Sequence, residues 1–255
     1  MPLSAPGLAY PDAVDFQSYL DHVDADADRV ADLAPANLTR PVPACPGWNV
    51  REVVSHLAEV YEHKIACTER GRQPDPWPPE WPADRDPVGW MADARGRLLE
   101  LLRARGPEAA SYTWFPADQS VGFWGRRMAH ETVVHRVDVE QAVAQPSRVD
   151  PSLAVDGIDE VLQVCLAGDW SDEPFERPLD EAVGVRAASG WWRVDQHQQR
   201  VEVSSRPGAV EGQVSGDPAE VMLWLWGRAP DTAVEMTGDR AVIQRLRDRL
   251  KLATQ

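Results

Sequence analysis

The hydrophobic period of the chain changes near residue 168. Before this point apolar residues recur every three or four positions, as on one face of an amphipathic helix. After it, the runs 182–187, 191–194 and 200–204 alternate between apolar and polar residues, as in strands with one buried face. The two patterns predict an α plus α+β chain: a helical bundle over residues 1–168 and a smaller α/β domain over residues 169–255.

The boundaries of the expected elements come from helical spacing, prolines and capping residues. We expect helices over 12–33, 49–70, 88–105, 122–144 and 153–166, two further helices after Asp217 and Gly238, and a short strand over 232–236. Asn49 and Glu52 have the spacing of a capping box at the start of the second helix. Asp217 followed by Pro218 marks another helix start.

The charge of the chain limits its partners. A formal net charge of −15 argues against nucleic acids and anionic membranes, because both require a basic surface. No apolar run has the length of a membrane span, and the first residues lack the basic and apolar regions of a signal peptide. We therefore expect a soluble, cytoplasmic protein.

The three cysteines, Cys45, Cys67 and Cys165, are far apart in the sequence. Their odd number and the absence of a CxxC pair give no support to a disulfide framework or a zinc knuckle. We expect all three to be small buried hydrophobic residues. Cys45, beside a proline turn, is the one to test as a reactive thiol.

The predicted helix 122–144 carries a carboxylate and an imidazole on one face. Glu131 and His135 are four residues apart, so they lie within about 40° of each other around the helix. His130 is turned about 140° away from His135, so this is not the HExxH pattern of a metalloprotease. The pair supplies half of a tetrahedral metal site, and a third ligand must come from another element.

His56 is the candidate for that third ligand. It falls on the apolar stripe of the predicted second helix, together with Val53 and Leu57. A single histidine there is ordinarily a core residue bonded to a backbone or hydroxyl group. In a helical bundle, however, His56, Glu131 and His135 can meet in the interior. Two nitrogens and one oxygen suit zinc, with the fourth position open to water or substrate, as in a catalytic site.

Other polar residues near these positions have two interpretations each. Asp138, one turn after His135, could hold the other ring nitrogen of His135 or be an exposed helix charge. His63 lies about 10 Å from His56 along the helix, too far for the same ion but within reach of a substrate. Glu52 and Glu59 could replace Glu131, although Glu52 has the capping role and we expect Glu59 to be solvated.

The segment 71–87 is rich in proline and tryptophan, so it cannot be helical. It is long for a connection in a compact domain. We interpret it as a lid or rim over a site, or as a surface crossover between two helices.

Two stretches, VPACPGWNVREVVSHLAEV and MAHETVVHRVDVEQA, resemble the mycothiol-dependent maleylpyruvate isomerase family of actinobacteria. SGDPAEVMLWLWGR resembles the smaller C-terminal α/β domain of the same family. The resemblance implies a DinB-like, metal-binding four-helix bundle at the N-terminus. It also implies that His56, Glu131 and His135 correspond to the family's zinc ligands.

The resemblance further implies a low-molecular-weight thiol, mycothiol or a similar compound, as cosubstrate. A cation that binds the thiol sulfur favours the nucleophilic thiolate. The thiolate would either isomerise a cis double bond by reversible addition or be transferred to a small electrophile. Arg228 is our candidate for holding a substrate carboxylate, and its alternative role is a cation at a helix C-terminus.

Two alternatives to an enzyme remain open from the sequence. The chain could be a non-catalytic module that kept the fold and binds a small ligand or a protein. A purely structural metal site is less favoured, because only three protein ligands are visible. The identity of the metal, the thiol and the electrophile, and the oligomeric state, are left open by the sequence.

Overall fold

A computed structural model describes residues 14–79, 81, 85–172 and 180–254. Within them the chain forms two compact units, Asp15–Arg148 and Val149 onward. The division therefore falls before the helix that begins at Pro151, whereas the change of period suggested residue 168. The helix that begins at Pro151 packs against a helix of the second unit. The periodicity of a helix indicates which of its faces is buried, but not which element covers that face.

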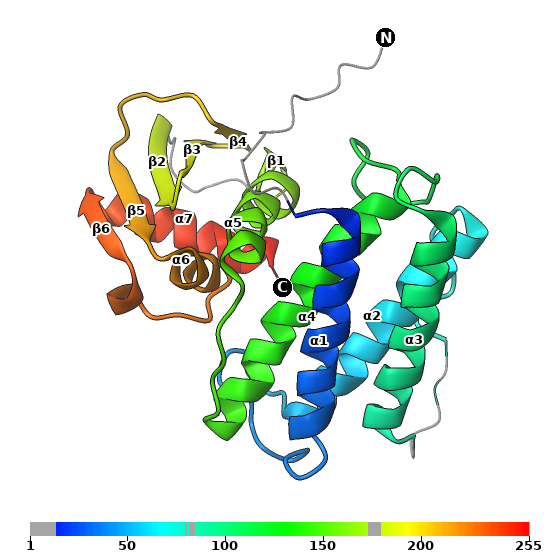
Figure 1. Cartoon of the computed structure of the whole chain (residues 1–255). Coiled ribbons are helices and arrows are strands. Elements are labelled where there is room, and N and C mark those ends of the chain that lie inside the picture. Colours follow the sequence, from blue (N-terminus) through cyan, green and yellow to red (C-terminus); the bar gives the residue numbers. More distant parts are fainter. Residues whose placement is uncertain (1–13, 80, 82–84, 173–179, 255) are drawn as a thin grey trace. The chain divides into compact units, whose positions relative to one another are not determined.

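The first unit consists of four helices that lie side by side (Figure 1). They are α1 (Phe16–Leu33), α2 (Val50–Arg70), α3 (Pro87–Arg105) and α4 (Val121–Val143). Each packs mainly against two neighbours, in the order α1, α4, α2, α3 and back to α1. The apolar stripes meet in a core that includes Leu20, Val23, Val30, Val53, Leu57, Tyr61, Met91, Leu98, Leu102, Trp124, Met128 and Val133. The predicted four-helix bundle is confirmed.

Local chemistry explains where these helices begin and how closely they pack. The Asn49 side chain accepts hydrogen bonds from Arg51 N and Glu52 N, while the Glu52 carboxylate accepts from Asn49 N, so the predicted capping box is present. Helix α1 begins at Phe16, because the Asp15 side chain caps it by accepting a hydrogen bond from Ser18 N, and residue 12, the expected start, lies outside the described residues. A Cβ added at Gly125 would lie 2.6 Å from the Phe16 ring, so this glycine allows α1 to approach α4 closely.

The second unit is a six-stranded mixed sheet with three helices (Figure 1). Helix α5 (Pro151–Glu160) continues as a π-helical turn, η1 (Val161–Leu166), and is followed by α6 (Pro218–Leu225) and α7 (Arg240–Ala253). The strands are β1 (Gly168–Asp169), β2 (Asp180–Ala187), β3 (Gly190–His197), β4 (Arg200–Ser204), β5 (Gly212–Gly216) and β6 (Glu235–Gly238). Their order is β1-β4-β3-β2-β5-β6, and among the described strands the β2–β5 pair is parallel and the other pairs are antiparallel.

Burial alternates along β3, so one face of the sheet is covered and the other is more exposed. Helix α7 packs against β2 and β5, and Trp192, Val194, Val214, Ile243 and Leu246 are buried in this unit. The strand expected at 232–236 is wrong in part, because residues 231–233 form a 3₁₀ turn before β6. Strand β5 was missed, since five residues with glycine at both ends carry little strand signal.

The proline- and tryptophan-rich segment lies against the bundle where it is described. Trp77 contacts the His63 ring at 4.9 Å between centroids, and Trp81 contacts Trp90 at 4.9 Å. Residues 80 and 82–84 lie outside the described residues, so a lid or rim stays a prediction. No helix in the described part of the chain is long and apolar enough to cross a membrane.

Candidate metal centre

The three predicted ligand residues come together between α2 and α4. His56 Nε2 lies 3.0 Å and His135 Nε2 lies 3.4 Å from the same oxygen, Glu131 Oε1. The two imidazole rings are 4.9 Å apart and nearly perpendicular. As expected, His130 is on another face, where it is fully buried and touches the Tyr19 ring edge. Helical spacing therefore predicted which of the two α4 histidines joins the cluster.

Asp138 is buried behind His135 rather than exposed to solvent. Its Oδ2 atom lies 2.9 Å from His135 Nδ1, and none of its surface is accessible. Because this carboxylate oxygen accepts a hydrogen bond from His135 Nδ1, the ring hydrogen stays on Nδ1 and Nε2 faces Glu131. Of the two interpretations of Asp138, the exposed helix charge is wrong, and the contact with the His135 ring nitrogen is present.

Charge balance in the cluster centres on Glu131. Burial disfavours the ionised carboxyl, but the charge of Arg127 and hydrogen bonds with His135 and His56 outweigh it, so the pKa of Glu131 lies well below its ordinary value. Arg127 donates to the second carboxylate oxygen from one turn earlier on α4. Burial also opposes protonation of His135, yet hydrogen bonds with Asp138 and Glu131 raise its pKa to about 9. Without a metal the cluster thus holds a proton where a cation could bind.

A second cation, Lys64, lies further along α2. Its ammonium is 4.8 Å from the centroid of the Trp124 ring and 3.1 Å from His63 Nδ1. Burial is the main cause that lowers the Lys64 pKa to about 8. Burial and the charge of Lys64 lower the pKa of His63 to about 4. His63 does not belong to the ligand cluster, in agreement with the distance estimated from helical rise.

The loop before α2 contributes two residues that helical spacing did not predict, Trp48 and Cys45. The Trp48 ring lies 5.1 Å from the His56 ring and stacks on His135 at 6.4 Å. Cys45 Sγ lies 3.4 Å from Asp138 Oδ2. Backbone hydrogen bonds from Val42 N to Trp48 O (3.0 Å) and from Trp48 N to Cys45 O (2.9 Å) shape this turn. Both residues belong to the motif that carried the family resemblance, which was the available signal.

Arg127 was also missed, although its position could have revealed it. It precedes Glu131 by four residues, so the two share a face of α4. Arg228 lies in the second unit, just after α6, where its side chain donates to Trp226 O at 2.8 Å. Its role in binding a substrate carboxylate stays a prediction.

The donor set fits a zinc-type ion. A tetrahedral ion with ligand bonds of about 2.0–2.1 Å holds its ligand atoms about 3.3 Å apart. The two Nε2 atoms lie 3.0 and 3.4 Å from Glu131 Oε1, and all three ligand atoms are within 4.8 Å of one another. Two imidazoles and one carboxylate leave a fourth position for a further ligand.

Protein-family models match both parts of the chain. The mycothiol maleylpyruvate isomerase N-terminal domain matches residues 20–140, and the MDMPI C-terminal domain matches residues 152–245. The chain belongs to the mycothiol maleylpyruvate isomerase family. Family membership was thus predicted correctly from the sequence motifs. The family boundaries also place residues 152–166 with the C-terminal domain, as the compact units do.

Solved structures of this isomerase family share the fold. The crystal structure of the mycothiol-dependent maleylpyruvate isomerase matches with a TM-score of 0.56 at 14% identity, covering 88% of this chain and 94% of that one. A histidine-to-alanine mutant of the isomerase matches with a TM-score of 0.58 at 13% identity and the same coverage. No curated protein sequence matches the chain significantly. The likeness establishes the architecture of a helical region followed by a small mixed-sheet domain.

Proposed function

We propose that this chain is a metal-dependent enzyme that uses a low-molecular-weight thiol, mycothiol in the first instance, to isomerise or modify a small electrophile. The observation that carries the proposal is the convergence of His56, Glu131 and His135 on one point, with Asp138 behind His135. Three protein ligands with an open fourth position are the pattern of a catalytic rather than a structural site. Zinc is the divalent ion that this N, N, O set favours.

A bound cation would stabilise the thiolate form of the cosubstrate, which is the nucleophile. The protein groups around it have separate tasks. Asp138 holds the His135 ring in the orientation that presents Nε2. Arg127 pairs with the outer oxygen of Glu131 and leaves Oε1 facing the two histidines. The Trp48 ring stacks on His135 and lies tilted against His56, so it packs beside both imidazoles.

The two candidate reactions begin in the same way. In isomerisation the thiolate sulfur adds to an activated cis double bond, the resulting single bond rotates, and the sulfur leaves. In transfer the sulfur stays on the electrophile. The ligand set activates sulfur equally for both, so the choice depends on the substrate. Arg228 stays our candidate for binding a substrate carboxylate in either reaction.

Metal content is the test of this proposal. Elemental analysis should find about one divalent ion per chain in the wild type and almost none in His56→Ala. His63→Ala is the matched control, because it removes a histidine from the same helix outside the cluster, and it should keep the ion. A wild type that contains no metal and does not take up added zinc would overturn the enzyme proposal and leave a ligand-binding module as the better account.

If the ion is present, thiol-dependent activity is the next measurement. Mycothiol and simpler thiols should be screened against cis-unsaturated 2-oxo acids, with product geometry and free thiol both followed. Thiol recovered unchanged with a trans product indicates isomerisation, whereas thiol consumed one-for-one with the electrophile indicates transfer. A protein with one bound ion and neither reaction would refute the thiol chemistry while leaving the metal site intact.

A further inference from the structure

A second group of ligand atoms lies on the other side of the His135 ring. Cys45 Sγ is 3.4 Å from Asp138 Oδ2, and the same oxygen is 2.9 Å from His135 Nδ1. The three ligand atoms all lie within 4.8 Å of one another. The proposed catalytic ion would use His135 Nε2, whereas this group uses Nδ1. The two groups therefore share His135 but use different nitrogens of its ring.

The ligand types in this second group differ from those of the first. A thiolate, an imidazole and a carboxylate form a softer set than two imidazoles and a carboxylate, because sulfur favours thiophilic ions. Deprotonated Cys45 and ionised Asp138 carry two negative charges, which would balance a divalent cation. In the metal-free protein these charges are met by hydrogens, since Cys45 donates to the carboxylate oxygen that also faces Nδ1. A cation at this point would replace those hydrogens.

The backbone holds Cys45 at this position. Cys45 N donates to Val42 O at 3.2 Å, and Cys45 O accepts from Trp48 N at 2.9 Å, so the turn fixes the direction of the side chain. Cys45 is half-buried, whereas Asp138 has no accessible surface. An ion could reach the group from the Cys45 side. The other two cysteines have no place in the clusters of ligand atoms found among the described residues.

We propose that Cys45, Asp138 and His135 form a second cation seat, selective for divalent ions softer than zinc, such as cadmium, and exclusive of the first. Exclusivity follows from the chemistry of imidazole. A neutral ring has one lone pair, so when Nδ1 binds an ion, Nε2 carries the hydrogen and donates to Glu131 Oε1, 3.4 Å away. Occupation of the second seat thus removes His135 from the first, and the chain binds one ion in total.

The test is titration of the metal-free protein with cadmium ions while thiolate-to-cadmium charge-transfer absorption is recorded in the ultraviolet. The first seat contains no sulfur, so this absorption reports on the second seat alone. We expect a band that saturates at one cadmium per chain, is lost in Cys45→Ser and is kept in Cys67→Ser and Cys165→Ser. His56→Ala, which damages only the first seat, should keep the band and bind cadmium at least as tightly as the wild type.

Affinity supplies an independent measurement. Cys45→Ser should weaken cadmium binding at least about tenfold, because an alcohol is a poor ligand for a soft ion. Circular dichroism of the variant checks that it folds, and cadmium NMR of the wild type shows directly whether sulfur is bound. No charge-transfer band in the wild type, a band that survives in Cys45→Ser, or two cadmium ions per chain would overturn the proposal.

These outcomes are separable from those of the proposed function. One zinc per chain that depends on His56, with no sulfur band for cadmium, would refute the second seat and leave the enzyme proposal standing. A Cys45-dependent cadmium band in a protein that does not bind zinc would refute the enzyme proposal and leave the second seat standing.

Discussion

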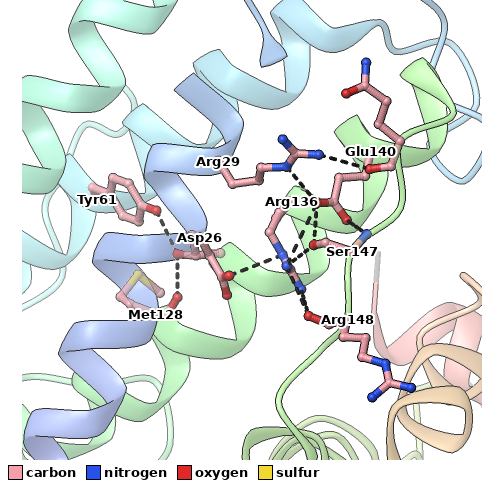
Figure 2. Close-up of polar contacts among 10 residues, drawn as sticks. Asp26, Arg29, Tyr61, Met128, Arg136, Glu140, Ser147 and Arg148 are labelled. Carbon is pink, nitrogen blue, oxygen red and sulfur yellow. Dashed lines mark hydrogen bonds and ion pairs between the residues drawn. The ribbon is translucent and has the colours of Figure 1, made fainter. Parts of the chain in front are cut away.

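Helix α4 carries two clusters of charged residues on different faces, and they are built in opposite ways. One is the candidate metal centre around Glu131 and His135. The other surrounds Arg136 and Glu140 and joins α1 to the chain that follows α4 (Figure 2). Both place ionisable groups in the interior of the same bundle. The difference between them shows how a buried charge becomes structural in one place and available to a ligand in another.

The Arg136 cluster is closed by protein groups. Arg136 lies 3.2 Å from Asp26 and donates to Arg148 O at 3.3 Å. The Glu140 carboxylate accepts from Ser147 N at 3.0 Å and from Arg29 at 3.2 Å. Arg136 and Glu140 are almost completely buried. Arg136 supplies the positive charge for the surrounding carboxylates, so this cluster needs no bound cation. Its hydrogen bonds hold the segment that follows α4 against the bundle.

The candidate metal centre is arranged differently. Two imidazoles face one carboxylate oxygen, and about a third of the His56 side chain is exposed. Each contact between the imidazoles and Glu131 Oε1 can be exchanged for a bond to a cation, while Arg127 keeps its contact with the other carboxylate oxygen. An open cluster of groups that titrate or exchange is therefore suited to binding, whereas a closed cluster with a fixed charge is suited to stability. Four substitutions test this contrast.

The largest effect on stability is expected for Arg136→Met. It leaves Asp26 and Glu140 without their central cation in a buried environment, which typically costs about 3–5 kcal/mol. Urea unfolding of the metal-free variant measures the loss. Arg29→Met is the control, because its side chain is about one-third exposed and the change should cost about 1 kcal/mol or less. Equal losses in the two variants would contradict the closed-cluster interpretation.

Glu131→Gln should weaken zinc binding by about a hundredfold or more, because a neutral amide replaces the anionic ligand. Isothermal titration of the metal-free protein gives the dissociation constant. Glu140→Gln is the matched change in the other cluster on the same helix, and it should lower stability while zinc affinity stays as in the wild type. A loss of zinc binding in both variants would mean that the two clusters are not independent.

Asp138→Asn should weaken zinc binding by about 10- to 100-fold, since a partner behind a metal-bound histidine typically contributes that much. The effect is smaller than for Glu131 because Asp138 acts through the ring of His135. Competition with a chromophoric chelator measures the affinity of both variants on one scale. Unchanged affinity in Asp138→Asn would show that the His135 ring is oriented by its packing alone.

Lys64→Met gives the smallest effect, and it depends on pH. The pKa of Lys64 is lowered to about 8 in the folded protein, from 10.5, so the charged form is penalised by burial below that value. The unfolded state binds more protons between about pH 8 and 10.5, and the wild type therefore gains stability as the pH rises through this window.

In metal-free protein, Lys64→Met should be about 1–3 kcal/mol more stable than the wild type at pH 7. Unfolding curves at pH 7 and 10 should show this advantage shrinking. An advantage that does not change with pH would contradict the shifted pKa.

Much of the candidate site could be predicted from local rules. Spacing along α4 placed Glu131 with His135 and turned His130 away, and the stripe of α2 put His56 on a face that meets them. Trp48 and Cys45 could not be placed in this way. They belong to a loop whose path depends on backbone hydrogen bonds between its own ends rather than on a periodic pattern. The burial of Lys64 and its lowered pKa could not be predicted from one helix, because both depend on neighbouring helices.

The sequence by itself determined the helical bundle, the sheet that follows it, the capping of α2 and the family to which the chain belongs. These features depend on periodicity and on short motifs, which act within one element. Only the tertiary structure decided that residues 151–166 group with the sheet, that Asp138 is buried, and that Arg136 closes one cluster while the other stays open. The physical reason is that burial and charge pairing depend on which elements pack together, and those contacts join residues far apart in the chain.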